Sequence, residues 1–144
     1  MAWVLVSSCV TARAQATAAG CDLHIHVDGL RNTRGVVGTL LFVAPKGWPD
    51  DVNKSYRHEA GQIDAASKSA TITCTQLPPG NYSIVALHDE NRNMKLDRNF
   101  LGIPKEGFGF ANNPKVVFGP PSFAQAIVTV ACPATDTTIH IQYK

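Results

Sequence analysis

Apolar and polar residues alternate along most of the chain after residue 20, which is the period of a β-strand with one buried face. Near the start, Leu23, Ile25 and Val27 share one face, and the residues between them are polar. In residues 70–75, threonines alternate with apolar residues, and β-branched residues favour strands. The pattern predicts six strands, over residues 21–30, 36–44, 70–75, 82–88, 125–132 and 137–143.

The segments between these strands differ in character. Residues 77–81 (Leu-Pro-Pro-Gly-Asn) predict a turn, because proline fixes φ and glycine permits a positive φ. Residues 45–69 are irregular and polar, which allows one short helix or an edge strand. Residues 97–123 contain eight glycines and prolines, too many for regular structure. A loop of this length in a compact domain is expected to be functional or pinned to the rest of the fold.

The strand predicted over residues 36–44 is almost continuously apolar, which is typical of a strand buried on both faces. No segment carries a sustained apolar stripe of helical period with caps at both ends. Short strands separated by turn signals predict an all-β fold, namely an antiparallel β-sandwich of about seven strands, immunoglobulin-like, with one long Gly/Pro-rich loop.

The N-terminus has an apolar run followed by Ala14-Gln15-Ala16, and signal peptidase accepts such small residues at its recognition positions. We therefore predict a signal peptide over residues 1–16 and a single β-sandwich domain over residues 17–144, exported to the periplasm or the extracellular space. A lipoprotein signal ending at Cys9 is less favoured, because the apolar stretch before this cysteine is too short. No transmembrane segment is expected, since no other run approaches the roughly 18 apolar residues that one needs.

Removal of residues 1–16 leaves three cysteines, Cys21, Cys74 and Cys132. An odd number in an oxidising compartment implies one disulfide and a free thiol, or an intermolecular link. Cys21 opens the first predicted strand and Cys132 closes a later one, so antiparallel pairing would bring them together. Cys74 shares the inward parity of Ile72. We predict a Cys21–Cys132 disulfide and a buried free thiol at Cys74.

Composition limits the classes of partner. Hydrophobic residues make up 44% of the chain and charged residues 17%, which fits a globular core and not a disordered chain. The net charge is +2, and the basic residues are scattered without a basic face or an RNA-binding signature. Nucleic acid is therefore not an expected partner.

Oxygen-bearing side chains recur at alternate positions directly after the strand predicted over residues 82–88. They occupy positions 1, 3, 5 and 9 of a calcium loop, and a backbone carbonyl would serve at position 7; the predicted metal ligands are Asp89, Asn91, Asn93, Lys95 and Asp97. Only two of these ligands are carboxylates, so the expected affinity for calcium is weak, roughly 10⁻⁴–10⁻³ M.

A metal-free cluster of Asx turns is the alternative, in which the same side chains accept hydrogen bonds from backbone amides. An EF-hand is excluded because Phe100 stands at position 12 and no flanking helices are expected.

Two passages resemble known bacterial families. Residues 77–84 (LPPGNYSI) are similar to the LPPGxYxV signature of prealbumin-like and collagen-adhesin B-type sandwiches. Residues 88–114 (HDENRNMKLDRNFLGIPKEGFGFANNP) and 118–123 (FGPPSF) closely resemble the bacterial domain of unknown function 2141. The resemblance covers residues 21–144 and implies a small exported, prealbumin-like all-β domain, without implying an activity.

The chain departs from the family's usual pattern, DENGNGKLD, in having Arg92 and Met94 where that pattern has glycines. The second of these positions commonly needs a left-handed backbone, which costs a non-glycine residue about 1 kcal/mol. The departure weakens the calcium binding that we expect.

Other residue groups have weaker signals. Glu90 and Glu106 with the loop aspartates would suit a carboxylate pair for glycoside hydrolysis. A Ser-His-Asp arrangement would need Ser83 or Ser122 near His88, and no nucleophile elbow is present. Three histidines on alternating strand positions, His24, His26 and His140, would suit a transition metal if their strands were neighbours, but a solvated polar face is the favoured interpretation.

Aromatic residues flank the long loop, namely Trp48, Phe108, Phe110, Phe118 and Phe123. They would form a platform for a sugar or peptide, or would plug the loop onto the sandwich, and the second interpretation is favoured. The leading hypothesis is an uncharacterised, exported, non-enzymatic β-sandwich module that presents residues 89–123, organised by calcium or by Asx turns, to a protein or glycan of the cell envelope. The alternative is a cell-envelope hydrolase that uses the acidic loop residues.

Overall fold

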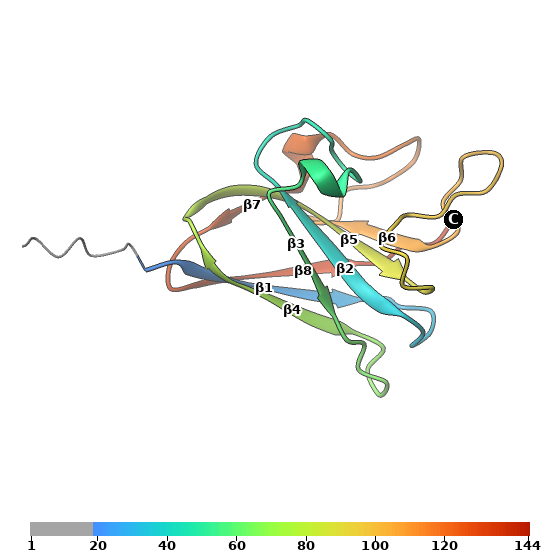
Figure 1. Ribbon diagram of the computed structural model, residues 1–144, viewed down its shortest axis with the longest axis horizontal. Helices are drawn as coiled ribbons and strands as arrows, with labels where there is room; N and C mark the ends of the chain where they lie inside the picture. The colour runs from blue at the N-terminus through green and yellow to red at the C-terminus, as the bar shows by residue number, and fades with distance from the viewer. Residues whose placement is uncertain (1–18) are drawn as a thin grey trace, which may run out of the picture.

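Two β-sheets face each other in the computed structural model, which describes residues 19–144 (Figure 1). The three-stranded sheet has the order β4-β1-β8, with β4 Ala70–Leu77, β1 Cys21–Asp28 and β8 Ala134–His140. The five-stranded sheet has the order β3-β2-β5-β6, with β7 also paired to β5; the bounds are β3 Arg57–Gly61, β2 Val36–Phe42, β5 Gly80–Asp89, β6 Gly107–Phe110 and β7 Ile127–Val130. Two 3₁₀ helices, η1 Val52–Lys54 and η2 Phe123–Ala126, lie in connecting segments.

This two-sheet arrangement confirms the predicted all-β sandwich, with eight strands among residues 19–144 where about seven were expected. No helix in this part of the chain is long and apolar enough to cross a membrane. The signal peptide predicted over residues 1–16 lies outside the described residues.

Strand β6 was not expected, because residues 97–123 were predicted to lack regular structure. Its glycines have a packing reason: Gly107 and Gly109 face the end of β8 and the residues after it. A Cβ atom at Gly107 would overlap with Ile141 and Tyr143, and one at Gly109 would overlap with the backbone of His140. Glycine in a strand often marks such a close approach, so these two residues permit the strand instead of breaking it.

The first and last strands run parallel, in a register that pairs Asp22 with Ala134 and Asp28 with His140. This differs from the fully antiparallel sandwich that we predicted. The parallel pairing places Cys132, just before β8, beside Cys21 at the start of β1, with their Cα atoms 4.5 Å apart. The predicted Cys21–Cys132 disulfide is present, although the expected reason for it was wrong. Cys74 is a free, buried cysteine, and burial raises the pKa of its thiol to about 11.

The core lies between the sheets and follows the alternation seen in the sequence. Leu23, Ile25 and Val27 of β1 are fully buried, as are Ile84 of β5 and Ile139 of β8. Fully burying such a side chain contributes about 1.5–3 kcal/mol, so the alternating pattern fixes which face of each strand turns inward.

The outer face of the five-stranded sheet is also apolar. It is covered by three connecting segments, residues 43–56, 90–106 and 111–126, which we call the loop layer. A second cluster of buried side chains joins this layer to the sheet, with Phe42, Val85, Phe108 and Phe110 from the strands and Ala126 from the layer. The apolar character predicted for both faces of residues 36–44 therefore has a structural basis.

Trp48 fastens the loop layer to the sheet. Its ring lies 5.5 Å from Phe42, 5.6 Å from Phe110 and 5.9 Å from Phe123 between centroids. Its indole Nε1 donates a hydrogen bond of 2.9 Å to the carbonyl of Pro121. Four of the five aromatic residues therefore plug the loops onto the sheet, whereas Phe118 is 97% exposed.

Candidate functional site

The loop that follows β5 is wound around Asp89, which is buried at the end of the strand. Asp89 Oδ1 accepts a hydrogen bond from the backbone N–H of Asn93 at 3.1 Å, and Oδ2 accepts one from Met94 at 2.8 Å. Both carboxylate oxygens therefore hold backbone amides, as in an Asx turn.

The predicted ligands do converge in space. Asp97 accepts hydrogen bonds from the Nδ2 atoms of Asn91 at 2.6 Å and Asn93 at 3.0 Å. Asn93 Oδ1 accepts the backbone N–H of Lys95 at 2.9 Å. Amide nitrogens, not oxygens, thus face the Asp97 carboxylate, and no group of three or more His, Cys, Asp or Glu residues suited to a metal lies within residues 19–144.

The two residues that replace glycines in this loop adopt the left-handed backbone that glycine favours. The φ angles are +61° at Arg92 and +58° at Met94. Each costs roughly 1 kcal/mol relative to a right-handed conformation. The hydrogen bonds of Asp89 and Asn93 offset this strain by holding the same turns.

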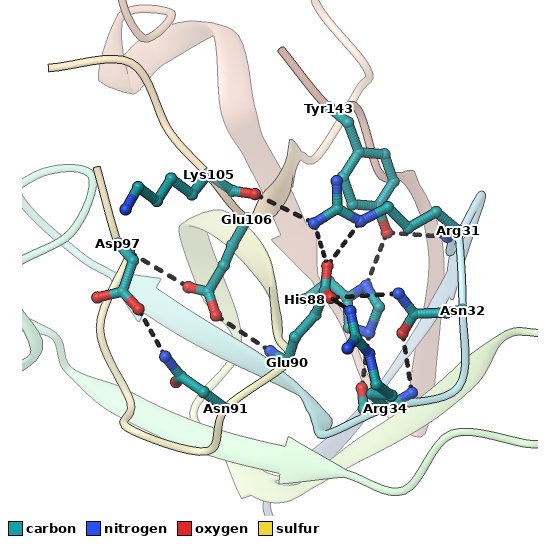
Figure 2. A network of polar contacts seen from close by, with 10 residues as sticks. All are labelled: Arg31, Asn32, Arg34, His88, Glu90, Asn91, Asp97, Lys105, Glu106 and Tyr143. Carbon is teal, nitrogen blue, oxygen red and sulfur yellow. Dashed lines mark hydrogen bonds and ion pairs between the residues drawn. The ribbon is translucent and has the colours of Figure 1, made fainter. Parts of the chain in front are cut away.

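Glu106, the residue directly before β6, holds the two ends of the loop together. Its two carboxylate oxygens accept the backbone N–H groups of Glu90 at 3.1 Å and Asp97 at 3.2 Å (Figure 2). Burial raises the pKa of Glu106, and the nearby Asp89 and Asp97 raise it further, against the lowering effect of the two backbone hydrogen bonds. The side chain joins the two ends of the loop and is only 5% exposed.

Glu90 is held by the segment between β1 and β2. Arg31 Nε donates to Glu90 Oε1 at 2.7 Å, Arg34 Nη2 to Oε2 at 2.7 Å, and Asn32 Nδ2 to Oε2 at 3.2 Å (Figure 2). Burial raises the pKa of Glu90, but the hydrogen bonds from Asn32 and Arg31 and the charge of Arg31 lower it below its usual value. These partners were not predicted, since the connection of residues 29–35 carries no recognisable motif.

His88 lies fully buried beneath this network. Its Nε2 donates to the carbonyl of Arg34 at 2.8 Å, so in the neutral ring Nδ1 accepts the hydroxyl of Tyr143 at 2.7 Å. The same hydroxyl accepts the backbone N–H of Arg31 at 3.0 Å, and the Arg31 guanidinium lies 4.6 Å from the centre of the Tyr143 ring. His88 therefore has a structural role, and both of its ring nitrogens have a partner.

Ser83, which was considered as a nucleophile for hydrolysis, is also held by a hydrogen bond inside the protein. Ser83 is fully buried, and its hydroxyl donates to the carbonyl of Phe123 at 2.6 Å. The strand histidines also have partners: His24 Nδ1 lies 3.0 Å from Asp136, His26 lies near Thr71, and His140 pairs with Asp28.

A groove opens between the segments of the loop layer, with a volume of about 840 Å³. Its floor is the outer face of β2 and β5, where Gly38 lies between Ala60 of β3 and Leu87 of β5 in the strand register. Its walls come from the loops and include Met94, Leu96, Ile103, Val116 and Phe118, and Phe108 of β6 also lines it. Pockets that hold small ligands have volumes of roughly 300–1,000 Å³ and mostly apolar linings.

The groove was not predicted from the sequence, although two of its three loops lie within the predicted interaction segment, residues 89–123. Two features of the sequence could have indicated the groove: residues 36–44 are apolar on their outer face, and this run contains a single glycine, Gly38. Gly38 needs no special backbone conformation, and a Cβ atom there would meet nothing within 4 Å. Its small size therefore contributes to the hollow itself.

Comparison with known proteins identifies one family. The sequence profile of DUF2141, described as an uncharacterized protein conserved in bacteria, matches residues 25–139. No curated protein and no solved structure matches the chain. The match includes six complete strands, β2 to β7, together with the loop with its Glu90 and Glu106 contacts and all three segments of the loop layer. The chain therefore belongs to the bacterial family DUF2141.

Proposed function

We propose that this domain is an exported, non-enzymatic binding module that holds an acyl chain in the groove of the five-stranded sheet. The observation that carries the proposal is the groove itself, about 840 Å³ of space with a predominantly apolar lining. Export is supported by the Cys21–Cys132 disulfide, because such bonds persist in oxidising compartments.

The lining favours an acyl chain over the glycan or protein that the sequence led us to expect. The backbone groups of the floor are engaged in the sheet, since β2 pairs with β3 and β5, and β5 pairs with β2 and β6. A peptide or sugar in the groove would bring N–H, C=O or hydroxyl groups without partners, at a cost of roughly 1–3 kcal/mol each. A hydrocarbon chain carries no such groups.

Two basic side chains among the lining residues, Arg98 and Lys144, suit an acidic head group. The carboxylates of Asp50, Glu59 and Asp89 also line the groove, and each already accepts a hydrogen bond from the protein. Arg98 pairs with Asp50 at 3.3 Å, and Lys144 Nζ donates to the carbonyl of Val116 at 2.8 Å. Both contacts are at the surface, where exchange for a ligand carboxylate costs little.

The alternative of a cell-envelope hydrolase has less support. Glu90 and Glu106 are engaged with arginines and backbone amides and lie outside the groove. Their carboxylates hold the loop in place, and this role explains their burial without a catalytic function.

Filling the groove from its floor tests the proposal. Gly38→Phe is expected to weaken binding of the fluorescent fatty acid cis-parinaric acid by at least about tenfold, because the ring would occupy the space of the ligand. The melting temperature should stay the same or rise, since a strand residue with a side chain replaces glycine where there is room.

Thr73→Phe is the matched control. Thr73 is exposed on the outer face of the three-stranded sheet, so the same ring is added far from the groove. The proposal is wrong if the natural protein does not bind the probe, or if Gly38→Phe binds it as tightly as Thr73→Phe does.

We also propose calcium as a weak ligand of the loop at Asp89, Asn91, Asn93, Lys95 and Asp97, supported by the convergence of both asparagines on Asp97. Rotation of the two amides would turn oxygens toward a cation. At ten times its dissociation constant, calcium should add about 1.4 kcal/mol to the free energy of unfolding. Asp97→Ala should remove this increment and Met94→Gly should enlarge it, as measured by thermal melts with and without calcium.

Asp136→Ala serves as the control, because Asp136 is an exposed carboxylate far from the loop in the strand register. If millimolar calcium leaves the melting temperature of the natural protein unchanged, the loop is a metal-free set of Asx turns.

A further inference from the structure

The exposed apolar side chains of the domain are concentrated in the loop layer. Eight large hydrophobic residues are exposed within residues 19–144, and six of them lie in two loops, residues 94–103 and 116–120. Phe100 and Leu101 are 95% and 67% exposed, and Val117 and Phe118 are 67% and 97% exposed. We call these two pairs the apolar tips. Figure 1 shows the two loops projecting to the same side of the molecule, near the C-terminus.

The first tip is a rigid turn whose backbone polar groups are paired internally. Asn99 Oδ1 accepts the N–H groups of Leu101 at 2.9 Å and Ile103 at 3.0 Å. The N–H of Gly102 donates to the carbonyl of Asn99 at 2.9 Å, and Arg98 donates to the carbonyl of Gly102 at 3.1 Å. A turn with few free backbone groups enters an apolar phase at low cost, whereas an open loop would leave N–H and C=O groups without partners.

Five basic side chains lie near the tips in the sequence or bond to a residue beside them, and we call them the basic rim. Lys95, Arg98 and Lys105 flank Phe100 and Leu101, and Lys115 precedes Val117. These four are exposed, and so is Lys144, whose amino group bonds to Val116 beside the second tip. The acidic groups nearby are engaged: Asp97 by two asparagines, Asp50 by Arg98, and Glu106 by backbone amides.

Apolar tips within a basic rim match the chemistry of an anionic lipid surface. Aromatic and aliphatic side chains partition into the boundary between head groups and acyl chains, and each lysine or arginine near an anionic surface adds electrostatic attraction. An apolar protein partner would account for the tips but not for the basic rim around them.

We propose that the apolar tips dock this domain on a bilayer that contains anionic phospholipid. Phe100, Leu101, Val117 and Phe118 enter the head-group boundary, and the basic rim faces the phosphates. The proposal goes beyond the acyl-binding function. Phe100 and Leu101 do not line the groove, whereas Val117 and Phe118 belong both to its lining and to the apolar tips. Ile103, Val117 and Phe118 line the groove, so part of its lining then faces the membrane.

Co-sedimentation with vesicles tests the docking surface. The full chain should sediment with vesicles of phosphatidylcholine and phosphatidylglycerol, less with phosphatidylcholine alone, and less again at high salt because charges are screened. The double variant Phe100→Asp/Leu101→Asp should bind the anionic vesicles at least about tenfold more weakly, since two apolar side chains become charged. Val43→Asp, at an exposed apolar residue outside the two loops, should bind as the natural protein does.

The outcomes separate this proposal from the acyl-binding function. Gly38→Phe should lose the fatty-acid probe and still sediment with vesicles, whereas the Phe100/Leu101 variant should bind the probe and stay in solution. The docking proposal is overturned if the natural protein does not sediment with anionic vesicles, or if the tip variant sediments equally well. It is also overturned if sedimentation velocity shows that the tips instead join two copies of the chain and vesicles do not bind.

Discussion

Removing the disulfide with Cys21→Ala/Cys132→Ser is expected to lower the free energy of unfolding by about 4–5 kcal/mol. The bond closes a loop with a sequence separation of 111 residues, and in the chain-entropy model a loop of this length gives a stabilisation near the upper end of the usual range. Domains of this size are typically stable by only about 5–15 kcal/mol, so the variant should be close to unfolding at physiological temperature. Denaturant titration of the natural and variant proteins measures the difference.

Reduction of the natural protein provides an independent check, because it breaks the same bond without changing a residue. Cys74→Ala is the control variant, since this buried thiol is not bonded and its loss should have a much smaller effect. If the reduced and oxidised proteins unfold at the same denaturant concentration, the bond does not constrain the unfolded chain. Non-reducing peptide mapping that links Cys74 to either partner would contradict the assignment itself.

The second large effect is expected at Trp48. Trp48→Ala should cost about 3–5 kcal/mol, the range for truncating a packed tryptophan, because three aromatic rings lose their common neighbour. Trp48→Phe should cost about 1 kcal/mol, mainly through loss of the hydrogen bond to Pro121. Both variants weaken the contacts that hold the loop layer on the sheet. Since these loops form the walls of the groove, the affinity for the acyl probe should fall along with stability.

Phe118→Ala is the comparison for this prediction. Its ring is almost fully exposed, so truncation should change stability by less than about 0.5 kcal/mol. Thermal and denaturant unfolding of the three variants gives the ranking. Equal stabilities for Trp48→Ala and Phe118→Ala would show that the loop layer does not depend on Trp48.

Local pattern was sufficient to predict most strands but not how they pair. Alternation in residues 21–28 identifies the buried face of β1, because that periodicity is a property of the strand alone. The parallel orientation of β8 beside β1 is set by how the whole chain crosses the sandwich, and no local pattern encodes it. Strand β6 was missed for a similar reason, since the glycines that permit it are explained only by residues 139–143.

The candidate site was predictable to the extent that its residues are adjacent in sequence. The grouping of Asp89, Asn91, Asn93 and Asp97 follows from their spacing, and the structure brings them together. The partners of Glu90 come from a segment more than fifty residues earlier, and the groove is formed by three separate connections. Such features depend on tertiary contacts, so a single sequence gives at most a hint, such as a glycine within an apolar strand.

The parallel pairing of the first and last strands determines how the domain would respond to mechanical tension. In the reduced protein, a force that separates the start of β1 from the end of β8 would pull along both strands and load their hydrogen bonds together, in shear and not one after another. In the oxidised protein the load takes a different path. The Cys21–Cys132 bond carries this force directly from one strand to the other. The chain between these cysteines, which contains seven of the eight strands, is then outside the path of the load. While oxidised, the domain would extend little under tension, and the groove and its loops would remain intact.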